Sequence, residues 1–409
     1  MNRLARLATT ALLTLSAAAS AAAGTALPPH WVASWQASPQ PVWGADFLFP
    51  TGIPAALNDQ TFRQTARISL GGPRLRVRLS NAYGTAPLRI GAASVAGSAG
   101  AVPVALTFDG QPGTLIAPGA ERVSDPLPLP TRDLQAVQVD VYVPGSTPLQ
   151  TFHWDGRQTS AIAPGNQTTR ATLGDSTTTT ARLFLTGIDV EAPAAARTVV
   201  VIGDSITDGA TASLDRDQRW TDHLAARLAP QGIAVVNAGI SGGRLLRDGM
   251  GDSALARFQR DVLAQPGVAS VVVLVGINDI SWPGTAFARD QPRPTLAQLQ
   301  AGYGALIAQA HAQGVRVIGA TLTPFAGALP GTPLDDYYHA DKDALRHQLN
   351  AWLREGAPFD DVIDLDAALR DPADPARLAA AFDSGDHLHP GDAGNRAMAE
   401  AVDLAVFGE

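Results

Sequence analysis

The 409-residue sequence contains no cysteine. This absence excludes a cysteine nucleophile, a thiolate metal site and a disulfide framework, so packing alone has to hold the folded chain together. The sequence also lacks a cluster of Lys and Arg residues, and its formal net charge is −8. Because an acidic protein without a basic patch repels phosphate backbones, nucleic acid is not an expected partner.

Long apolar runs are also scarce, and the prominent one lies at the N-terminus. Arg3 and Arg6 precede an apolar stretch over residues 7–18, and the small residues 21–23 follow it. This pattern is typical of a secretory signal peptide, here predicted as residues 1–23. The run is shorter than the roughly 20 residues that a membrane-spanning helix needs. We therefore expect a secreted or periplasmic protein with a bacterial export signal and no membrane span in the mature chain.

The remainder of the chain has two halves with different hydrophobic periods. Short alternating runs separated by Gly and Pro occupy residues 28–191, for example Thr61–Leu70 and Ala136–Val143. Such runs predict an antiparallel β-sandwich of jelly-roll type. Residues 192–196 follow neither pattern and predict a linker.

Residues 197–409 instead alternate apolar strands with amphipathic helices. The expected strands are 198–202, 233–237, 270–275, 315–321 and 361–365, and the expected helices are 219–228, 254–263, 296–312, 342–353 and 393–406. Buried strands separated by helices form right-handed βαβ units, which build a parallel sheet covered on both faces. This half is predicted to be α/β, a flavodoxin-like three-layer α/β/α domain with a parallel five-stranded sheet.

Polar turns follow the first three strands of this predicted sheet. They are Gly203-Asp204-Ser205, Asn237-Ala238-Gly239 and Gly276-Ile277-Asn278-Asp279. Ligands bind outside the carboxyl ends of the strands in an open parallel sheet, so we expect these turns to meet at one edge. Ser205 is the candidate nucleophile. The backbone amides of Ser205 and Gly239 and the side-chain amide of Asn278 are candidate donors to an oxyanion.

A serine nucleophile needs a base that is held in one tautomer. The loop 383–390, just before the last expected helix, contains two histidines, His387 and His389. Asp386 lies three residues before His389, so one turn can bring this carboxylate and imidazole together, whereas adjacent side chains tend to diverge. We therefore favour His389 as the base and Asp386 as its partner. His387 remains a competitor for the same carboxylate.

A second serine competes with Ser205. Gly239-Ile240-Ser241-Gly242-Gly243 matches the G-x-S-x-G elbow of α/β-hydrolases and also follows a strand. An elbow leads directly into a helix, whereas residues 242–251 are rich in glycine. A nucleophilic Ser241 also leaves the turns at Ser205 and Asn278 unexplained, so we favour Ser205.

These residues resemble the four blocks of the SGNH, or GDSL, hydrolase superfamily. The matching blocks, in chain order, are Gly203-Asp204-Ser205-Ile206, Gly239, Asn278 and Asp386-x-x-His389, and the resemblance covers about half of the chain. It implies a serine esterase that works through an acyl-enzyme and needs no metal or other cofactor. The implied triad is Ser205, His389 and Asp386, and the implied oxyanion hole is Ser205, Gly239 and Asn278.

Residues 236–242 and 276–280 also look like a branch of arylesterases and acylhydrolases found with xylan-degrading enzymes. Members of this branch often carry an N-terminal β domain, and Phe62-Arg63-Gln64 and residues 79–84 are similar to that region. The resemblance implies short acyl groups, such as acetyl, on plant polysaccharide. A lipase or lysophospholipase activity is the alternative. The expected partners are thus small-molecule or polysaccharide esters, and the oligomeric state stays open.

Aromatic residues suggest where substrate binds. The loops 281–295 and 324–341 follow the third and fourth strands and are expected to line the pocket, with these candidate walls: Trp282, Phe287, Phe325, Tyr337 and Tyr338. Four tryptophans lie in the β half: Trp31, Trp35, Trp43 and Trp154. They leave a carbohydrate-binding attachment protein as an alternative, although we favour core positions for them and an active-site-shaping role for the β half.

Overall fold

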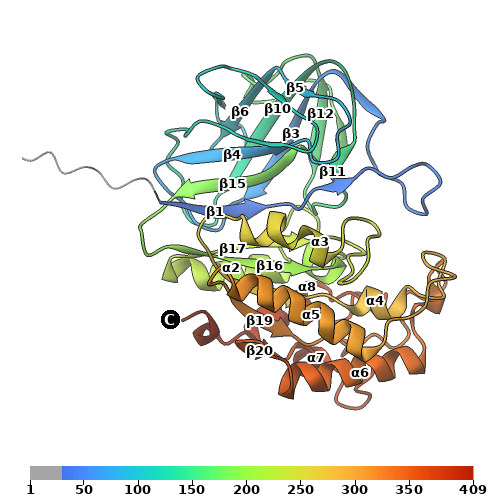
Figure 1. Ribbon diagram of the computed structural model, residues 1–409. Coiled ribbons are helices and arrows are strands. Elements are labelled where there is room, and N and C mark those ends of the chain that lie inside the picture. The colour runs from blue at the N-terminus through green and yellow to red at the C-terminus, as the bar shows by residue number, and fades with distance from the viewer. Residues whose placement is uncertain (1–29, 409) are drawn as a thin grey trace, which may run out of the picture.

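The computed structural model describes residues 30–408 (Figure 1). The predicted signal peptide, residues 1–23, and the first residues of the predicted β half lie outside the described residues. Antiparallel strands occupy the N-terminal region, residues 30–191, and a parallel sheet with helices begins at Arg197. Within residues 30–408, no helix combines the length and the apolar character that crossing a membrane requires.

The N-terminal region is built from strands β1 to β15. Their bounds are β1 (Trp31–Gln36), β2 (Gln40–Pro41), β3 (Ala56–Arg67), β4 (Leu75–Ser80), β5 (Leu88–Ile90), β6 (Ala92–Ala96), β7 (Val104–Ala105), β8 (Thr114–Ile116), β9 (Glu121–Val123), β10 (Ala136–Pro148), β11 (Thr151–His153), β12 (Ser160–Pro164), β13 (Thr177–Thr179), β14 (Arg182–Leu183) and β15 (Leu185–Glu191). The two main sheets run in the orders β1-β15-β4-β9 and β13-β12-β3-β10-β6-β7, and smaller sheets are β14-β11-β2 and β5-β8.

The alternating pattern of this region buries one face of each long strand. Val137, Val139 and Val141 of β10 are fully buried, and β10 pairs antiparallel with β3 and β6. Successive side chains of a strand point to opposite faces, so the valines enter the core together with Phe62 from β3. The strand expected at 136–143 lies within β10, and the strand expected at 61–70 is confirmed for residues 61–67, since β3 ends at Arg67.

The C-terminal region contains the predicted parallel five-stranded sheet. Its strands are β16 (Arg197–Gly203), β17 (Ile233–Gly239), β18 (Val268–Leu274), β19 (Arg316–Ala320) and β20 (Asp361–Ile363), in the order β17-β16-β18-β19-β20. All four neighbouring pairs are parallel. An order of 2-1-3-4-5 along the chain is the flavodoxin-like one, which confirms the predicted fold class.

The helices form two groups on this sheet. They are α1 (Ser205–Asp208), α2 (Trp220–Leu228), α3 (Ala254–Phe258), α4 (Ile277–Ser281), α5 (Leu296–His311), α6 (Ala340–Glu355), α7 (Leu365–Leu369) and α8 (Asp392–Glu400), with short turns η1 (Ala229–Gln231), η2 (Gln259–Leu263), η3 (Asp335–Tyr337) and η4 (Leu404–Phe407). Helix α2 contacts α8, whereas α5 contacts α3 and α6. Right-handed crossovers place these groups on opposite faces, which explains why the strands are apolar on both sides.

Helix α8 differs from its prediction in length. It ends at Glu400 instead of continuing to residue 406, where a separate short turn, η4, has formed. The carboxylate of Asp392, the first residue of the helix, does not cap it. It instead accepts hydrogen bonds from the amide (2.8 Å) and the hydroxyl (2.6 Å) of Ser213.

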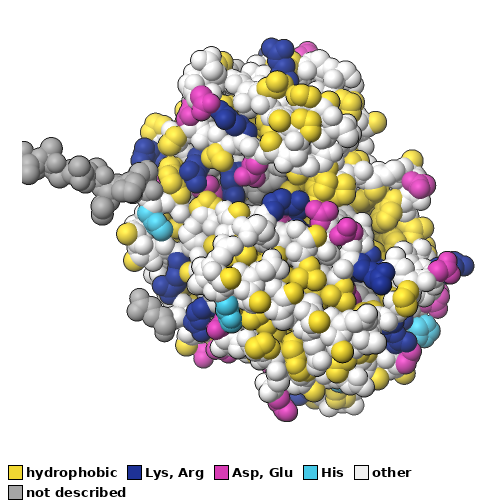
Figure 2. All heavy atoms as spheres, viewed as in Figure 1, with side chains coloured by type: hydrophobic (Ala, Val, Ile, Leu, Met, Phe, Trp, Pro, Cys, Tyr) yellow, Lys and Arg dark blue, Asp and Glu magenta, His cyan; other side chains and the backbone are white. Residues whose placement is uncertain are grey.

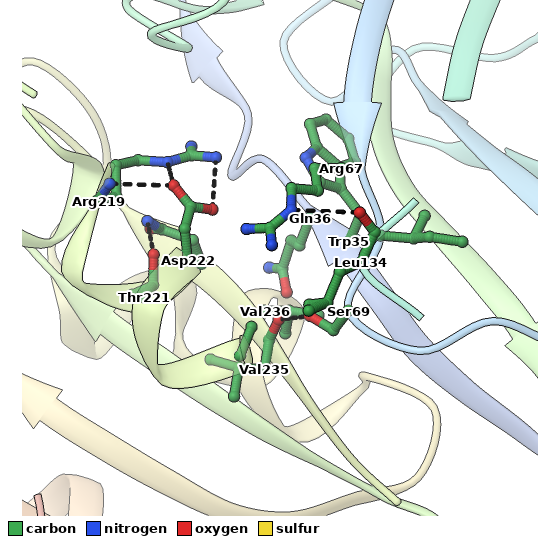
Figure 3. A pocket seen from close by; sticks show the side chains of 13 residues that line it. Trp35, Gln36, Arg67, Ser69, Leu134, Arg219, Thr221, Asp222, Val235 and Val236 are labelled. Carbon is green, nitrogen blue, oxygen red and sulfur yellow. Dashed lines mark hydrogen bonds and ion pairs between the residues drawn. The ribbon is translucent and has the colours of Figure 1, made fainter. Parts of the chain in front are cut away.

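The two regions pack directly against each other. Strand β1 lies beside β17, the edge strand of the parallel sheet (Figure 1). Figure 3 shows this interface, where the Ser69 hydroxyl donates to the carbonyl of Val235 and where a cavity of only about 20 Å³ remains. The side-chain amide of Gln36 also donates across the interface, to the carbonyl of Asp261 (2.9 Å). The N-terminal region therefore covers an edge that would otherwise expose unpaired backbone groups.

Candidate active site

A cavity of about 320 Å³ opens at the carboxyl edge of the parallel sheet. Its polar lining comes from the turns after β16, β17 and β18 and from the loop before α8, and comprises Ser205, Ser241, Gly242, Asn278, Asp386 and His389. The turns that were expected to share one edge therefore do so. This is the position at which open parallel sheets bind their ligands.

Ser205 begins helix α1 directly after strand β16. Asp204 caps this helix by accepting a hydrogen bond from the amide of Ile206 (3.0 Å). Burial raises the pKa of Asp204 to about 7. The Ser205 hydroxyl lies 2.8 Å from Nε2 of His389, within hydrogen-bond distance. Because the short helix turns away from the strand end, the hydroxyl is presented to the cavity.

Asp386 holds His389 from the other side. Its Oδ2 lies 2.6 Å from Nδ1 of His389, and its Oδ1 accepts the backbone amides of Leu388 (2.9 Å) and His389 (2.8 Å). Burial opposes the ionisation of Asp386, but the hydrogen bonds and the charge of His389 outweigh it and hold the pKa of Asp386 well below its usual range. This carboxylate therefore remains charged and fixes the imidazole with Nε2 directed at Ser205.

His387 and Ser241, the competing base and nucleophile, are bound to other side chains. Nδ1 of His387 lies 2.5 Å from Oδ2 of Asp383, so this histidine does not compete for Asp386. The hydroxyl of Ser241 donates to Oδ2 of Asp208 (2.7 Å) instead of to a histidine. Among the residues that the structure describes, the serine–histidine–aspartate arrangement at the cavity is formed by Ser205, His389 and Asp386.

Asn278 lies in helix α4, at the floor of the same cavity. Its side-chain nitrogen donates to the carbonyl of Gly243 (2.9 Å), and its oxygen accepts from the hydroxyl of Tyr337 (2.8 Å). These two bonds fix the orientation of the carboxamide, because only the nitrogen can donate to a carbonyl. The second N–H of the same nitrogen is left for a ligand.

Gly239 does not occupy the position that the sequence assigned to it. Its amide donates to Oδ1 of Asn237 (2.8 Å), and the residue does not line the cavity. A Cβ at Gly239 would lie 2.4 Å from the amide nitrogen of Asp208, so this glycine serves the close packing of β17 against α1. An amide that is already bonded and directed elsewhere cannot bind an oxyanion at Ser205, and the assignment of Gly239 is corrected.

Gly242, three residues further on, lines the cavity beside Ser205. Within residues 30–408, the amides of Gly242 and Ser205 donate to no protein acceptor. Gly242 has a φ of +71°, and a Cβ there would lie 2.6 Å from the sulfur of Met250 and 2.7 Å from the ring of Trp282. Both the backbone conformation and the space therefore require glycine at this position.

The turn around Gly242 is fixed at both ends by buried carboxylates. Asp208 accepts the amide (2.9 Å) and the hydroxyl of Ser241, and Asp279 accepts the amides of Leu245 (2.6 Å) and Leu246 (3.0 Å). Burial raises the pKa of Asp279 to about 6 despite these two bonds. The turn is thus held in one conformation, as a site with preorganised donors requires.

The apolar walls come from both regions of the molecule. Trp282 and Tyr337 line the cavity as expected, together with Phe287, whereas Phe325 is fully buried and packs against Tyr337 and Tyr338 instead. Phe325 and Tyr338 are therefore not walls. The distinction follows from packing, because the loop 324–341 has to bury some of its rings beneath the others.

The N-terminal region supplies walls that sequence reasoning missed. Leu48 and Phe49, from the loop after β2, and Trp154, directly after β11, line the cavity. The rings of Phe49 and Trp154 stack 5.5 Å apart, and Phe49 also contacts Phe287. Figure 2 shows hydrophobic side chains gathered on the right-hand side of the molecule, where the two regions meet. No periodicity marks such long-range contacts, so the sequence contained no signal for them.

The described residues offer no alternative centre based on a metal. No group of three or more His, Asp or Glu side chains within residues 30–408 is arranged to hold a metal ion.

Residues 201–397 match the family model described as the GDSL-like Lipase/Acylhydrolase family. These residues form a GDSL-like lipase/acylhydrolase domain. The protein is accordingly a carboxylic ester hydrolase, and the cavity lies at the carboxyl edge of its GDSL domain. A search of curated proteins gave no match to the sequence.

Several solved structures are similar to about half of this chain. A GDSL-like lipase from Bacteroides thetaiotaomicron is 19% identical, covering 52% of this chain and 88% of that chain with a TM-score of 0.37. A catalytic mutant of an acetylxylan esterase from Geobacillus stearothermophilus is 24% identical, covering 52% and 94% with a TM-score of 0.38. An α/β hydrolase enzyme from the metagenome of Lake Arreo, Spain, is 22% identical, covering 53% and 97% with a TM-score of 0.37.

Proposed function

We propose that the protein is a serine esterase that hydrolyses carboxylic esters through a triad of Ser205, His389 and Asp386. The observation that carries this proposal is the continuous series of hydrogen-bond contacts from the Ser205 hydroxyl through His389 to Asp386, at the floor of an open cavity. The carboxylate of Asp386 keeps a proton on Nδ1 of His389. Nε2 is then free to accept the proton of Ser205 as its oxygen attacks the ester carbonyl.

The negative charge on the attacked carbonyl oxygen needs donors that are already in position. We assign this role to the amides of Ser205 and Gly242 and to the free N–H of Asn278, since all three residues line the cavity. Each such donor typically contributes about 3 kcal/mol to the stabilisation of the transition state. Gly242 thus replaces Gly239 in the oxyanion hole that the sequence predicted.

The reaction then proceeds in two halves. His389 donates the proton it received to the leaving alcohol, and an acyl group remains bound to Ser205. A water molecule, deprotonated by His389, attacks this acyl-enzyme and releases the acid. The proposed steps balance without a metal ion or another cofactor.

The walls of the cavity favour esters with an apolar group. Rings of Phe49, Trp154, Trp282 and Phe287 surround a space of about 320 Å³, which is much larger than an acetyl group. Burying an apolar acyl or alcohol group against these rings stabilises binding in proportion to the area removed from water. We therefore propose a small-molecule ester with a medium-length or aromatic substituent as substrate, which is closer to the lipase-type alternative of the sequence analysis.

Acetyl groups on plant polysaccharide remain the second candidate substrate. Trp154 supports this candidate, because it lies at the cavity and its ring has the type of flat apolar face that stacks on a sugar. Secretion or periplasmic export, the predicted location, is compatible with either substrate. The carbohydrate-binding alternative is less favoured, because Trp43 packs against Phe47 and Phe152 and Trp35 is buried.

Two serine variants test the proposed chemistry. Ser205→Ala is expected to abolish the hydrolysis of p-nitrophenyl esters, whereas Ser241→Ala, which keeps its backbone amide bonded to Asp208, is expected to lose far less activity. Full activity of Ser205→Ala, or loss only in Ser241→Ala, would overturn the triad.

A substrate profile tests the proposed ester. The wild-type protein should hydrolyse p-nitrophenyl butyrate to octanoate with a higher kcat/KM than the acetate, and should release little acetate from acetylated xylan. Rapid release of acetate from xylan, with no preference for longer acyl groups, would favour the second candidate.

A further inference from the structure

A buried histidine–aspartate pair, His153 and Asp208, lies outside the proposed triad. His153 ends strand β11 of the N-terminal region and is buried, with 5% of its surface exposed. Its Nε2 lies 2.9 Å from Oδ1 of Asp208, which ends helix α1 of the GDSL domain. Its Nδ1 lies 2.9 Å from the carbonyl oxygen of Ser38. The pair therefore joins the two regions directly behind the nucleophile helix.

The partners of His153 determine its protonation state. A carbonyl oxygen and a carboxylate oxygen are both acceptors, so both ring nitrogens have to donate. Burial and the nearby guanidinium of Arg182 disfavour a charged ring, but the charge and the hydrogen bond of Asp208 outweigh them and raise the pKa of His153. The two side chains thus form a buried imidazolium–carboxylate pair, a charge-assisted interaction of the stronger type.

The other oxygen of Asp208 reaches the proposed oxyanion hole. Oδ2 accepts both the amide (2.9 Å) and the hydroxyl (2.7 Å) of Ser241, the residue before Gly242. The peptide that joins Ser241 to Gly242 carries the amide assigned to the oxyanion. The direction of the Gly242 amide depends on how Ser241 is held, because both residues lie in one tight turn. The Gly243 amide closes this turn by donating to the carbonyl of Ile240 (2.7 Å).

We propose that His153 is a positioning residue for ester hydrolysis: by holding the Asp208 carboxylate it fixes the Ser241–Gly242 peptide and thereby aims the Gly242 amide at the oxyanion. This inference rests on the proposed function. It gives the N-terminal region a part in catalysis, because the GDSL domain lacks a partner of its own for Oδ1 of Asp208 among the described residues. Without His153 the carboxylate is left buried with an unpaired oxygen, and it is free to turn away from Ser241.

The test replaces His153 in the full chain and measures more than activity. His153→Ala is expected to lower kcat for a p-nitrophenyl ester by about 10- to 100-fold, less than the loss of a whole oxyanion donor, and to leave KM within about twofold. Affinity for an aryl boronic acid, which forms a tetrahedral adduct with a serine, should weaken by a similar factor. His153→Gln keeps a donor for Asp208 and should recover part of kcat.

His30→Ala is the matched control. His30 also belongs to the N-terminal region, and its Nε2 contacts the carbonyl of Ala196 (2.8 Å) at the linker, away from the cavity. It should leave kcat and boronate affinity unchanged. Equal losses in His30→Ala and His153→Ala would overturn the proposal, because they would report a general loosening of the interface. An unchanged kcat in a folded His153→Ala, or an effect confined to KM, would overturn it as well.

Two further measurements keep the outcomes separate. If His153→Ala does not fold, Asp208→Ala replaces it, because this variant removes both the partner of His153 and the acceptor of the Ser241 amide. The same losses of kcat and boronate affinity are expected, and wild-type values would overturn the proposal. Failure of the proposed function itself is recognised independently, by hydrolysis that persists in Ser205→Ala.

Discussion

The two regions of the molecule contribute unlike surfaces to one cavity. The GDSL domain supplies Ser205, His389, Asp386 and the amide donors, whereas the N-terminal region supplies mainly the apolar side chains Leu48, Phe49 and Trp154. The reactive groups are thus positioned by strand ends and short helices of the GDSL domain, whereas the apolar walls come from loops of both regions. The difference indicates that reactivity and selectivity are separable in this protein, since different segments of the chain carry them.

The His389–Asp386 and His153–Asp208 pairs show the same contrast at the level of side chains. His389 lies at the cavity and has Ser205 beside its free nitrogen, so it can exchange a proton with substrate. His153 has acceptors at both nitrogens and is buried, so it can only hold its partners in place. The role of each pair follows from the ring nitrogen that does not face the aspartate. In His389 this nitrogen contacts Ser205, and in His153 it contacts the carbonyl of Ser38.

The largest expected effect distinguishes two neighbouring histidines. His389→Ala should lower kcat/KM for p-nitrophenyl esters by about 10⁴-fold or more, because the serine loses its base. His387→Ala, whose imidazole contacts Asp383, is the matched control and should stay within a few-fold of the wild type. The reverse order would place the base at His387 and would contradict the assignment.

A glycine replacement tests the oxyanion turn. Gly242→Ala should lower kcat by about 100-fold, because its Cβ would collide with Met250 and Trp282 and displace the amide. Gly232→Ala is the control, since Gly232 has the same φ of +71° but no atom within 4 Å of a new Cβ. Gly232→Ala should lower the free energy of unfolding but leave kcat unchanged. Similar kcat values for the two variants would show that backbone strain, not the amide's position, accounts for any loss.

Removal of the N-terminal rings should change selectivity more than reactivity. Phe49→Ala and Trp154→Ala are each expected to lower kcat/KM for p-nitrophenyl octanoate by about 10-fold, from the lost apolar contact, and to change the value for the acetate little. Trp352→Ala serves as control, because this ring packs against Tyr303 and Phe359 and does not line the cavity. Equal losses on both esters would contradict the division of tasks between the regions.

The smallest expected effect concerns stability and pH. The folded protein lowers the pKa of Asp386 below its ordinary value of about 3.9 in an unfolded chain. The charged carboxylate therefore stabilises the fold at pH values above about 4, and this contribution is lost as the pH falls through the folded value. Urea unfolding of the wild type and Asp386→Asn should differ most near pH 7 and converge below pH 4. A difference independent of pH would contradict the ionic role.

Much of the GDSL domain could be predicted from local patterns. The strands at 198–202 and 233–237 were expected from their apolar composition, and β16 and β17 contain them. Ser205 and Asn278 were expected at one edge because parallel strands place their carboxyl ends together, and Asp386 and His389 were expected as a pair from their spacing; all four line the cavity. Their catalytic roles remain predictions that the variants above test.

The incorrect assignment of Gly239 to the oxyanion hole shows what local sequence patterns cannot predict. The sequence places Gly239 and Gly242 in the same turn, but the direction of each amide depends on neighbours. Asn237 takes the amide of Gly239, and the left-handed conformation of Gly242 leaves its own amide at the cavity. Which of the two glycines serves the site is thus decided by the direction of each amide, which the residue types alone do not fix.

The sequence by itself determined the class of fold, the order of the polar turns and the spacing of Asp386 and His389, because each depends on periodicity or on residues close together in the chain. Only the tertiary structure decided that Gly242 faces Ser205, that Phe325 is buried, and that Phe49, Trp154 and His153 reach the GDSL domain. These contacts join residues that are not neighbours in the sequence; His153 and Asp208, for example, are 55 residues apart. Packing between two regions selects such pairs, and no local pattern encodes them.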